Sequence, residues 1–233
     1  MLTRDKRKLS EPHSPLQLWT EKINMDFHDS LPSRDEAEKL LIWATKQNAG
    51  PWTEHCRAVA RAAETIAHKS SLDPDRAYVS GLLHDIGYYG YHNGKGRTCH
   101  IYLGYELMLK KGYEKVARIC LSHSFAHQDI RAYGGSDMNC TDKELAVITA
   151  FLSETTYNDY DKLIQLCDCL GTAQGICLME KRMLDVSRRN GFDGFTVRRW
   201  DSFLALKDCF DKICGTNIYN LFYDELVTYI FQQ

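Results

Sequence analysis

The spacing of apolar residues restricts the fold of this chain more than any other feature. Between Trp52 and Ala67, apolar side chains recur every three or four residues, which is the period of one face of an α-helix. Later segments repeat this period, and none shows a comparably strong alternation of apolar and polar residues, the pattern of a half-buried strand. The sequence therefore predicts an all-α fold.

Start and stop signals divide the chain into helices. Ser33 and Thr141 are each followed three residues later by glutamate, the capping-box pattern of a helix start. Residues 1–32 combine charge with three prolines, so we expect a weakly structured extension there and a helical domain over 33–233. Within that domain we expect helices over residues 33–49, 52–67, 73–87, 100–111, 113–123, 141–153, 160–170, 174–190 and 196–213, and a last helix from 217.

Composition and charge narrow the class of protein. The 233 residues are 44% hydrophobic and 26% charged, which is ordinary for a globular domain, and the net charge of −2 favours neither a nucleic-acid nor a membrane partner. Residues 1–13 lack the apolar stretch of a signal peptide, and the longest largely apolar run, Leu145 to Leu152, is far shorter than the roughly 20 residues of a membrane span. We expect a cytoplasmic protein.

The nine cysteines are odd in number and scattered, and no two form a C-x-x-C pair. Such usage is typical of a reducing compartment, where cysteine behaves as a small buried hydrophobe. Cys167 and Cys169 could also form a soft-metal pair, but a helix would turn their side chains roughly 200° apart.

Histidines and aspartates stand at core-facing positions of five successive predicted helices. His84-Asp85 follows an apolar helical stretch, and the other members lie inside or at the ends of similar stretches. The full set is His55, His84, Asp85, His100, His123 and Asp168. Each of them alone could be a core side chain with a hydrogen-bond partner or a charge at a helix end.

A metal site explains the set as a whole. An unpaired buried charge costs several kcal/mol or more, so buried carboxylates are normally paired or bound to metal. Imidazole and carboxylate ligands suit Zn, Fe, Mn or Ni, and no thiolate is placed to complete a closed structural zinc site. The sequence thus predicts a polynuclear transition-metal site.

These residues resemble the H…HD…D signature of the HD superfamily of metal-dependent phosphohydrolases. His55, His84-Asp85 and Asp168 match the signature in order, and His84-Asp85-Ile86-Gly87 is similar to its H-D-I-G variant. His100-x-x-x-Gly104 and His123 resemble the additional ligands of two-metal members such as the symmetrical diadenosine tetraphosphatases and the HD-GYP phosphodiesterases. The resemblance covers residues 52–173, and it implies a helical bundle with extra helices over 174–233.

The chain departs from these relatives in places. Tyr88 follows the H-D-I-G match, where many members have lysine or arginine, and Ser124 stands where the HD-GYP pattern has a second histidine. The G-Y-P element is absent, since Gly134-Gly135 is followed by Ser136. These departures weaken a cyclic-dinucleotide interpretation.

The resemblance also implies roles for the residues. It implies two divalent transition-metal ions, one held by His55, His84, Asp85 and Asp168 and the other by Asp85, His100 and His123. A hydroxide that bridges the two ions would attack the phosphoryl group. His127 could complete the second site or act as an acid, or it could be an exposed loop histidine. Lys95 and Arg97, in the loop after the HD pair, are our candidates for the cations that face the phosphate, in preference to the basic helices beyond residue 173.

We therefore expect an enzyme that hydrolyses a phosphate ester or anhydride of a small, nucleotide-type substrate. Two other interpretations remain open: an HD-fold di-iron oxygenase, and a non-catalytic nucleotide-binding regulatory module. We expect neither a membrane nor a nucleic-acid partner, and homodimerisation is left open.

Overall fold

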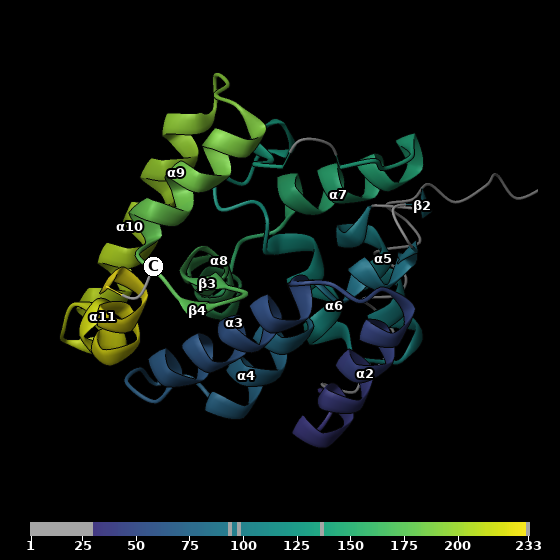
Figure 1. Cartoon of the computed structure of the whole chain (residues 1–233). Coiled ribbons are helices and arrows are strands. Elements are labelled where there is room, and N and C mark those ends of the chain that lie inside the picture. The colour runs from purple at the N-terminus through teal and green to yellow at the C-terminus, as the bar shows by residue number, and fades with distance from the viewer. Residues whose placement is uncertain (1–29, 93–94, 97–98, 136–137, 232–233) are drawn as a thin grey trace, which may run out of the picture.

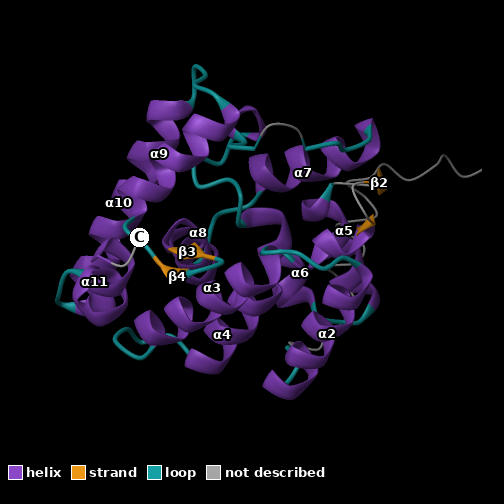
Figure 2. Ribbon diagram, in the orientation of Figure 1, coloured by secondary structure: helices purple, strands orange, loops and turns teal. Residues whose placement is uncertain are grey.

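The structure is a computed structural model that describes residues 30–92, 95–96, 99–135 and 138–231. It is all-α, as the sequence predicts (Figures 1 and 2). The α-helices are α2 (Arg34–Gln47), α3 (Trp52–Ala67), α4 (Pro74–Leu83), α5 (His100–Lys110), α6 (Glu114–Ser122), α7 (Asp142–Glu154), α8 (Asp159–Leu170), α9 (Met179–Asn190), α10 (Thr196–Cys214) and α11 (Tyr223–Phe231). Most of the predicted extension over residues 1–32 lies outside the described residues.

Short elements connect these helices. The 3-10 helices are η1 (Ile86–Gly90), η2 (Ile130–Ala132) and η3 (Ile218–Phe222). Two antiparallel pairs of two-residue strands were not predicted: β1 (Tyr91–His92) with β2 (Lys95–Gly96), and β3 (Gly171–Thr172) with β4 (Gly175–Ile176). The prediction of helix from residue 174 was wrong at its start, because Gly175 adopts a φ of 121° and turns the chain back into β4 before α9 begins.

The predicted helix starts rest on side-chain caps. Ser33 and Thr141 both form complete capping boxes with the glutamates three residues later. Asn158 and Asp161 form a further capping box at the start of α8, which the sequence pattern did not single out. Each box satisfies backbone N–H groups that a helix start would otherwise leave without partners.

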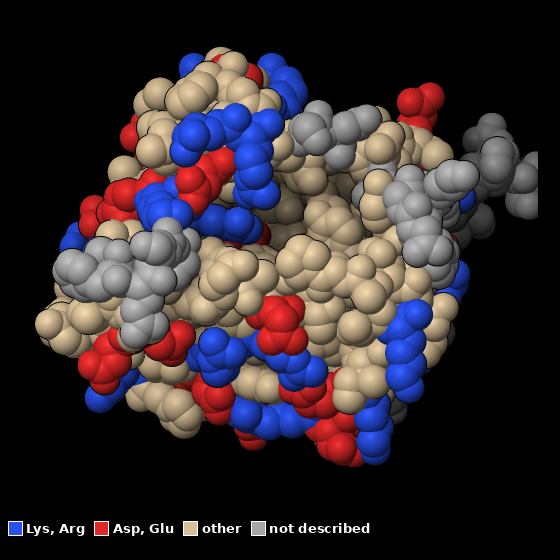
Figure 3. Space-filling model, in the orientation of Figure 1, with Lys and Arg blue, Asp and Glu red and all other residues tan. Residues whose placement is uncertain are grey.

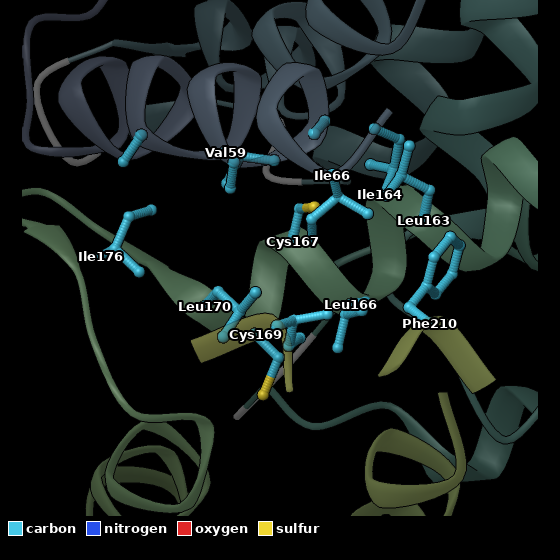
Figure 4. Packing of buried hydrophobic residues seen from close by; sticks show 14 of the residues in the cluster. Val59, Ile66, Leu163, Ile164, Leu166, Cys167, Cys169, Leu170, Ile176 and Phe210 are labelled. Carbon is cyan, nitrogen blue, oxygen red and sulfur yellow. The ribbon is translucent and has the colours of Figure 1, made fainter. Parts of the chain in front are cut away.

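Helix α3 lies at the centre of the packing. Its Ile66 lies beside Ile164 and Cys167 of α8, and the same cluster includes Val59 of α3 and Phe210 of α10 (Figure 4). A second apolar cluster joins α2, α4 and α6, and a third lies under α5 and α7. The three clusters hold the ends of α3, α4, α5, α6 and α8 around one region.

Small residues let the backbones approach closely in that region. A Cβ atom at Gly81 of α4 would lie 2.8 Å from the Cα of Ala60 in α3. One at Gly87 would lie 1.8 Å from the carbonyl oxygen of His100, and one at Gly104 would lie 2.9 Å from the Sγ atom of Cys120. Because no side chain larger than hydrogen fits at these points, the glycines fix how closely η1, α5 and α6 pack.

One expectation about the cysteines was wrong. Cys99 and Cys140 form a disulfide, although the scattered pattern predicted only unpaired thiols. The bond joins residues 41 apart in the sequence, a contact that spacing alone does not reveal. The other seven cysteines are free, and burial raises the pKa of the Cys167 and Cys169 thiols well above the ordinary value, which disfavours a soft-metal pair.

The described residues contain no helix with both the length and the apolar character needed to cross a membrane.

Candidate metal centre

The structure brings all six predicted ligands together, each from the end of a helix. His55 lies in the first turn of α3 and Asp168 in the last turn of α8. His84 and Asp85 link α4 to η1, His100 begins α5, and His123 directly follows α6. Five of the six residues are buried, and the side chain of Asp168 is 24% exposed.

The carboxylate of Asp85 lies at the centre of the group. Its Oδ1 atom is 3.3 Å from Nε2 of His100 and 3.2 Å from Nε2 of His123. Its Oδ2 atom faces the other pair, 3.5 Å from Nε2 of His84 and 3.8 Å from Nε2 of His55. Asp168 approaches that second pair, with Oδ1 3.0 Å from Nε2 of His55. The two oxygens of one carboxylate therefore face two separate histidine pairs.

Backbone carbonyl groups orient the imidazoles. Nδ1 of His55 lies 3.1 Å from the carbonyl oxygen of Gly171, and Nδ1 of His84 lies 2.7 Å from that of Gly81. Nδ1 of His123 lies 3.0 Å from the carbonyl oxygen of Cys120. A carbonyl oxygen only accepts, so each Nδ1 carries the proton and each neutral ring directs the lone pair of Nε2 inward.

This arrangement fits a bound metal. An Nε2 lone pair that faces a carboxylate oxygen at about 3 Å is repelled unless a proton or a metal ion lies between them. Nε2 of His84 is buried and has no hydrogen-bond partner among the described residues, so its lone pair is available to coordinate a metal ion. Imidazole nitrogens supported by carbonyl groups and combined with carboxylates form the typical ligand set of a transition-metal site.

The ligand atoms form three overlapping groups, in each of which they lie within 4.8 Å of one another. The groups are His55, His84 and Asp85; His84, His123 and Asp168; and Asp85, His100 and His123. The third group is one of the two metal sets that the family resemblance implied, and the first group holds three of the four members of the other set, which also includes Asp168. Their shared member is Asp85.

Burial and charge set the protonation of the group. Burial lowers the pKa of His100 to about 4 and lowers that of His84, which keeps both rings neutral near pH 7. Burial alone would raise the pKa of Asp85, but the neighbouring imidazoles outweigh it and hold that pKa well below its usual range. At His123 burial also lowers the pKa, but the hydrogen bond and charge of Asp85 outweigh it and raise that pKa above its usual value. Asp85 is thus an ionised carboxylate, the state needed for metal binding.

Aromatic residues that the sequence pattern did not place cover one side of the centre. The ring of Tyr88 stacks on His100, with 4.3 Å between ring centroids and 5° between the planes. Trp52 lies next to Tyr88, 6.0 Å away between centroids. Burial raises the pKa of Tyr88 far above its usual value, so its phenol stays neutral. The stack holds the His100 ring in place.

His127, the other predicted catalytic residue whose side chain the structure describes, is not part of this cluster. Nδ1 of His127 lies 3.2 Å from the Oγ atom of Ser202, and the ring lies 6.2 Å from that of Phe195. The backbone of Lys95 lies in β2, but its side chain and all of Arg97 lie outside the described residues, so their predicted role is untested.

A cavity of about 1040 Å³ opens onto the centre. Figure 3 shows it as a hollow in the surface, beside which Lys and Arg residues gather over α9 and α10. Five of the six proposed ligands line it: His55, Asp85, His100, His123 and Asp168. The opposite wall includes Arg182, Arg188, Arg189 and Arg199, which lie beyond the region of family resemblance.

Comparison with known proteins agrees with this geometry. A sequence model of the HD domain matches residues 52–172, which is more than half of the chain. The chain therefore belongs to the HD domain family, which consists largely of metal-dependent hydrolases. Searches of curated proteins and of solved structures gave no significant match. The family match does not distinguish subfamilies, so the resemblance to the two-metal phosphatases and phosphodiesterases stays a prediction.

Proposed function

We propose that this protein is a metal-dependent phosphohydrolase that cleaves a phosphate ester or anhydride of a nucleotide-type substrate. The observation that carries the proposal is the carboxylate of Asp85, whose two oxygens face two different pairs of histidines. One carboxylate between two nitrogen pairs is the arrangement of a bridging ligand in a two-metal site.

The chain would hold the ions in two sets. His55, His84 and Asp168 would complete one site, His100 and His123 the other, and Asp85 would belong to both. When bound, two divalent ions lower the pKa of a shared water and neutralise charge on a phosphoryl group under attack. The carbonyl groups that accept from the Nδ1 atoms keep the imidazoles in their binding tautomer.

The rest of the cavity supports a nucleotide-sized substrate. Its volume of about 1040 Å³ is at the upper end of the range typical of small-molecule sites. Trp52, Tyr88 and Tyr133 line it and offer aromatic faces on which a base can stack. Arg182, Arg188 and Arg189 also line it and can supply positive charge for phosphate oxygens.

Metal analysis and a phosphate-release screen test the proposal together. Protein purified without chelator should contain up to two transition-metal ions per chain and release phosphate from at least one nucleotide. His100→Ala and His123→Ala should each lower the content to about one ion and reduce turnover without unfolding the protein. His68→Ala, at a side chain 63% exposed and outside the cluster, is the matched control and should change neither.

Three results would contradict the proposal. Two iron ions with no phosphate release from any nucleotide would favour the di-iron oxygenase. Nucleotide binding without any turnover would favour the regulatory module. Global unfolding of both histidine variants would mean that these side chains are structural.

A further inference from the structure

The wall of the cavity opposite the metal ligands is built mainly by α9. Arg182, Arg188 and Arg189 of this helix line the cavity together with Arg199 of α10. Figure 3 shows Lys and Arg side chains gathered over these helices at the edge of the hollow. The Nδ2 atom of Asn190 donates to the carbonyl oxygen of Gly134 at 2.8 Å, which ties the end of α9 to the segment after η2. The arginines are therefore carried by a helix anchored at the cavity rim.

Not all of this charge is available to a ligand. Arg199 is paired with Asp193 at 3.0 Å and donates to Thr196, and its side chain is only 12% exposed. The carboxylate of Asp185, which also lines the cavity, is paired with Lys181 at 2.8 Å. Both groups are thus already engaged within the protein.

Arg182 and Arg189, unlike Arg199, are not engaged in an ion pair with a described residue. Within the described residues, no carboxylate lies within ion-pair distance of either guanidinium. Arg182 makes no side-chain hydrogen bond there, and Arg189 donates only through Nε, to the carbonyl oxygen of Asp185 at 3.3 Å. Their remaining N–H groups can donate to a ligand in the cavity.

The two arginines lie on one face of α9. They are seven residues apart, which is about two helical turns or 10 Å along the axis. Arg182 is the inner one, since it lies in the first turn of α9, which packs against α8, the helix that carries Asp168. The pair therefore extends from the metal centre outward along the cavity wall.

We propose that Arg182 and Arg189 form a second phosphate-binding subsite, so that the substrate carries at least two phosphate groups. The metal centre takes the phosphoryl group that is cleaved, and the guanidinium groups take a phosphate that is not. The class of ligand is a nucleoside di- or polyphosphate, in preference to a monophosphate. Planar guanidinium groups suit this role because they donate two parallel hydrogen bonds to phosphate oxygens. The assignment of the first phosphate rests on the proposed function.

Two non-hydrolysable probes test the subsite by isothermal titration calorimetry on the protein as purified. Methylphosphonate carries one phosphonate group, and methylenediphosphonate carries two. Wild-type protein should bind methylenediphosphonate at least about tenfold more tightly. The double variant Arg182→Gln/Arg189→Gln should lose about tenfold to hundredfold in affinity for methylenediphosphonate, as expected for removing charged hydrogen bonds, and less than about threefold for methylphosphonate.

A charge-matched control separates a subsite from general attraction. Arg131→Gln/Arg198→Gln removes the same charge from exposed arginines that do not line the cavity, and it should leave the affinity for both probes unchanged. If both double variants weaken methylenediphosphonate equally, or if the α9 variant weakens both probes equally, the effect is long-range electrostatics and the subsite is refuted. Unchanged affinity in the α9 variant also refutes it.

The same data separate this proposal from the proposed function. Selective loss of methylenediphosphonate binding, together with no phosphate release from any nucleotide, would retain the subsite and reject the hydrolase. Hydrolysis of nucleotides with no selective loss would retain the hydrolase and reject the subsite.

Discussion

Replacing Gly104 by alanine tests whether close packing of α5 positions the metal centre. The added Cβ atom would lie 2.9 Å from the Sγ atom of Cys120, about 0.5 Å inside the 3.4 Å at which ordinary contacts begin, and 3.3 Å from the backbone nitrogen of Gly87. Overpacking of this kind costs about 1–3 kcal/mol. Alanine in place of glycine inside a helix stabilises the helix by about 1 kcal/mol, so Gly104→Ala should lower the free energy of unfolding by up to about 2 kcal/mol.

Cys120→Ala removes the sulfur atom that causes the clash. On its own it should cost about 1 kcal/mol, since it leaves a small void at a fully buried position. In the Cys120→Ala background this clash is absent, so Gly104→Ala should stabilise the protein by about 1 kcal/mol. The interaction energy in this double-mutant cycle should therefore be about 1–3 kcal/mol.

Urea denaturation followed by circular dichroism measures the free energy of unfolding of all four proteins. Metal content provides a second readout, because Gly104 lies one turn after His100 and a displaced α5 moves that ligand away from Asp85. The content should fall in Gly104→Ala and recover in the double variant. Gly194→Ala, where an added Cβ atom meets no other atom within 4 Å, is the control. Additivity within about 0.5 kcal/mol would refute the packing argument.

Three further predictions concern the proposed metal ligands and the disulfide. Asp85→Ala should lose most of both metal ions because its carboxylate faces both histidine pairs, and two ions retained by that variant in elemental analysis would refute the bridging role. Thiol titration of the denatured protein should give seven thiols without reductant and nine after reduction, whereas nine in both cases would mean that Cys99 and Cys140 do not pair. Cys140→Ser should destabilise the protein by up to about 4 kcal/mol in urea denaturation, as loop entropy predicts for residues 41 apart.

Much of the fold and the ligand set could be predicted because the relevant signals are local. The capping boxes at Ser33 and Thr141 each lie within four residues, and both form as expected. Asp168 was singled out as a buried carboxylate from the apolar run around it, since a charge in such a stretch requires partners, and it does lie in the cluster, although its side chain is 24% exposed. In the sequence Gly87 and Gly104 stand out only as parts of motifs, whereas their physical role, close backbone packing, depends on the three-dimensional structure.

The signals that were missed depend on contacts between distant segments. Nothing in the spacing of Cys99 and Cys140 indicates that residues 41 apart meet. The stack of Tyr88 on His100 likewise depends on how η1 packs against α5. In both cases the chain path between the two residues, and not their local pattern, decides the contact.

The arginines of α9 illustrate the same limit and bear directly on specificity. Proximity in sequence favoured Lys95 and Arg97, which follow the HD pair within a dozen residues. The side chain of Lys95 and all of Arg97 lie outside the described residues, so that prediction stays untested. Independently of it, the hairpin of β3 and β4 turns the chain back after α8, so that α9 lies along the cavity and its Arg182 and Arg189 line it. The metal ligands all come from the part of the chain that matches the family, whereas these arginines come from helices outside it. Substrate preference in this protein should therefore depend on α9 even though the chemistry depends on the HD domain, and exchanging α9 residues should change which phosphates bind while leaving the metal content unchanged.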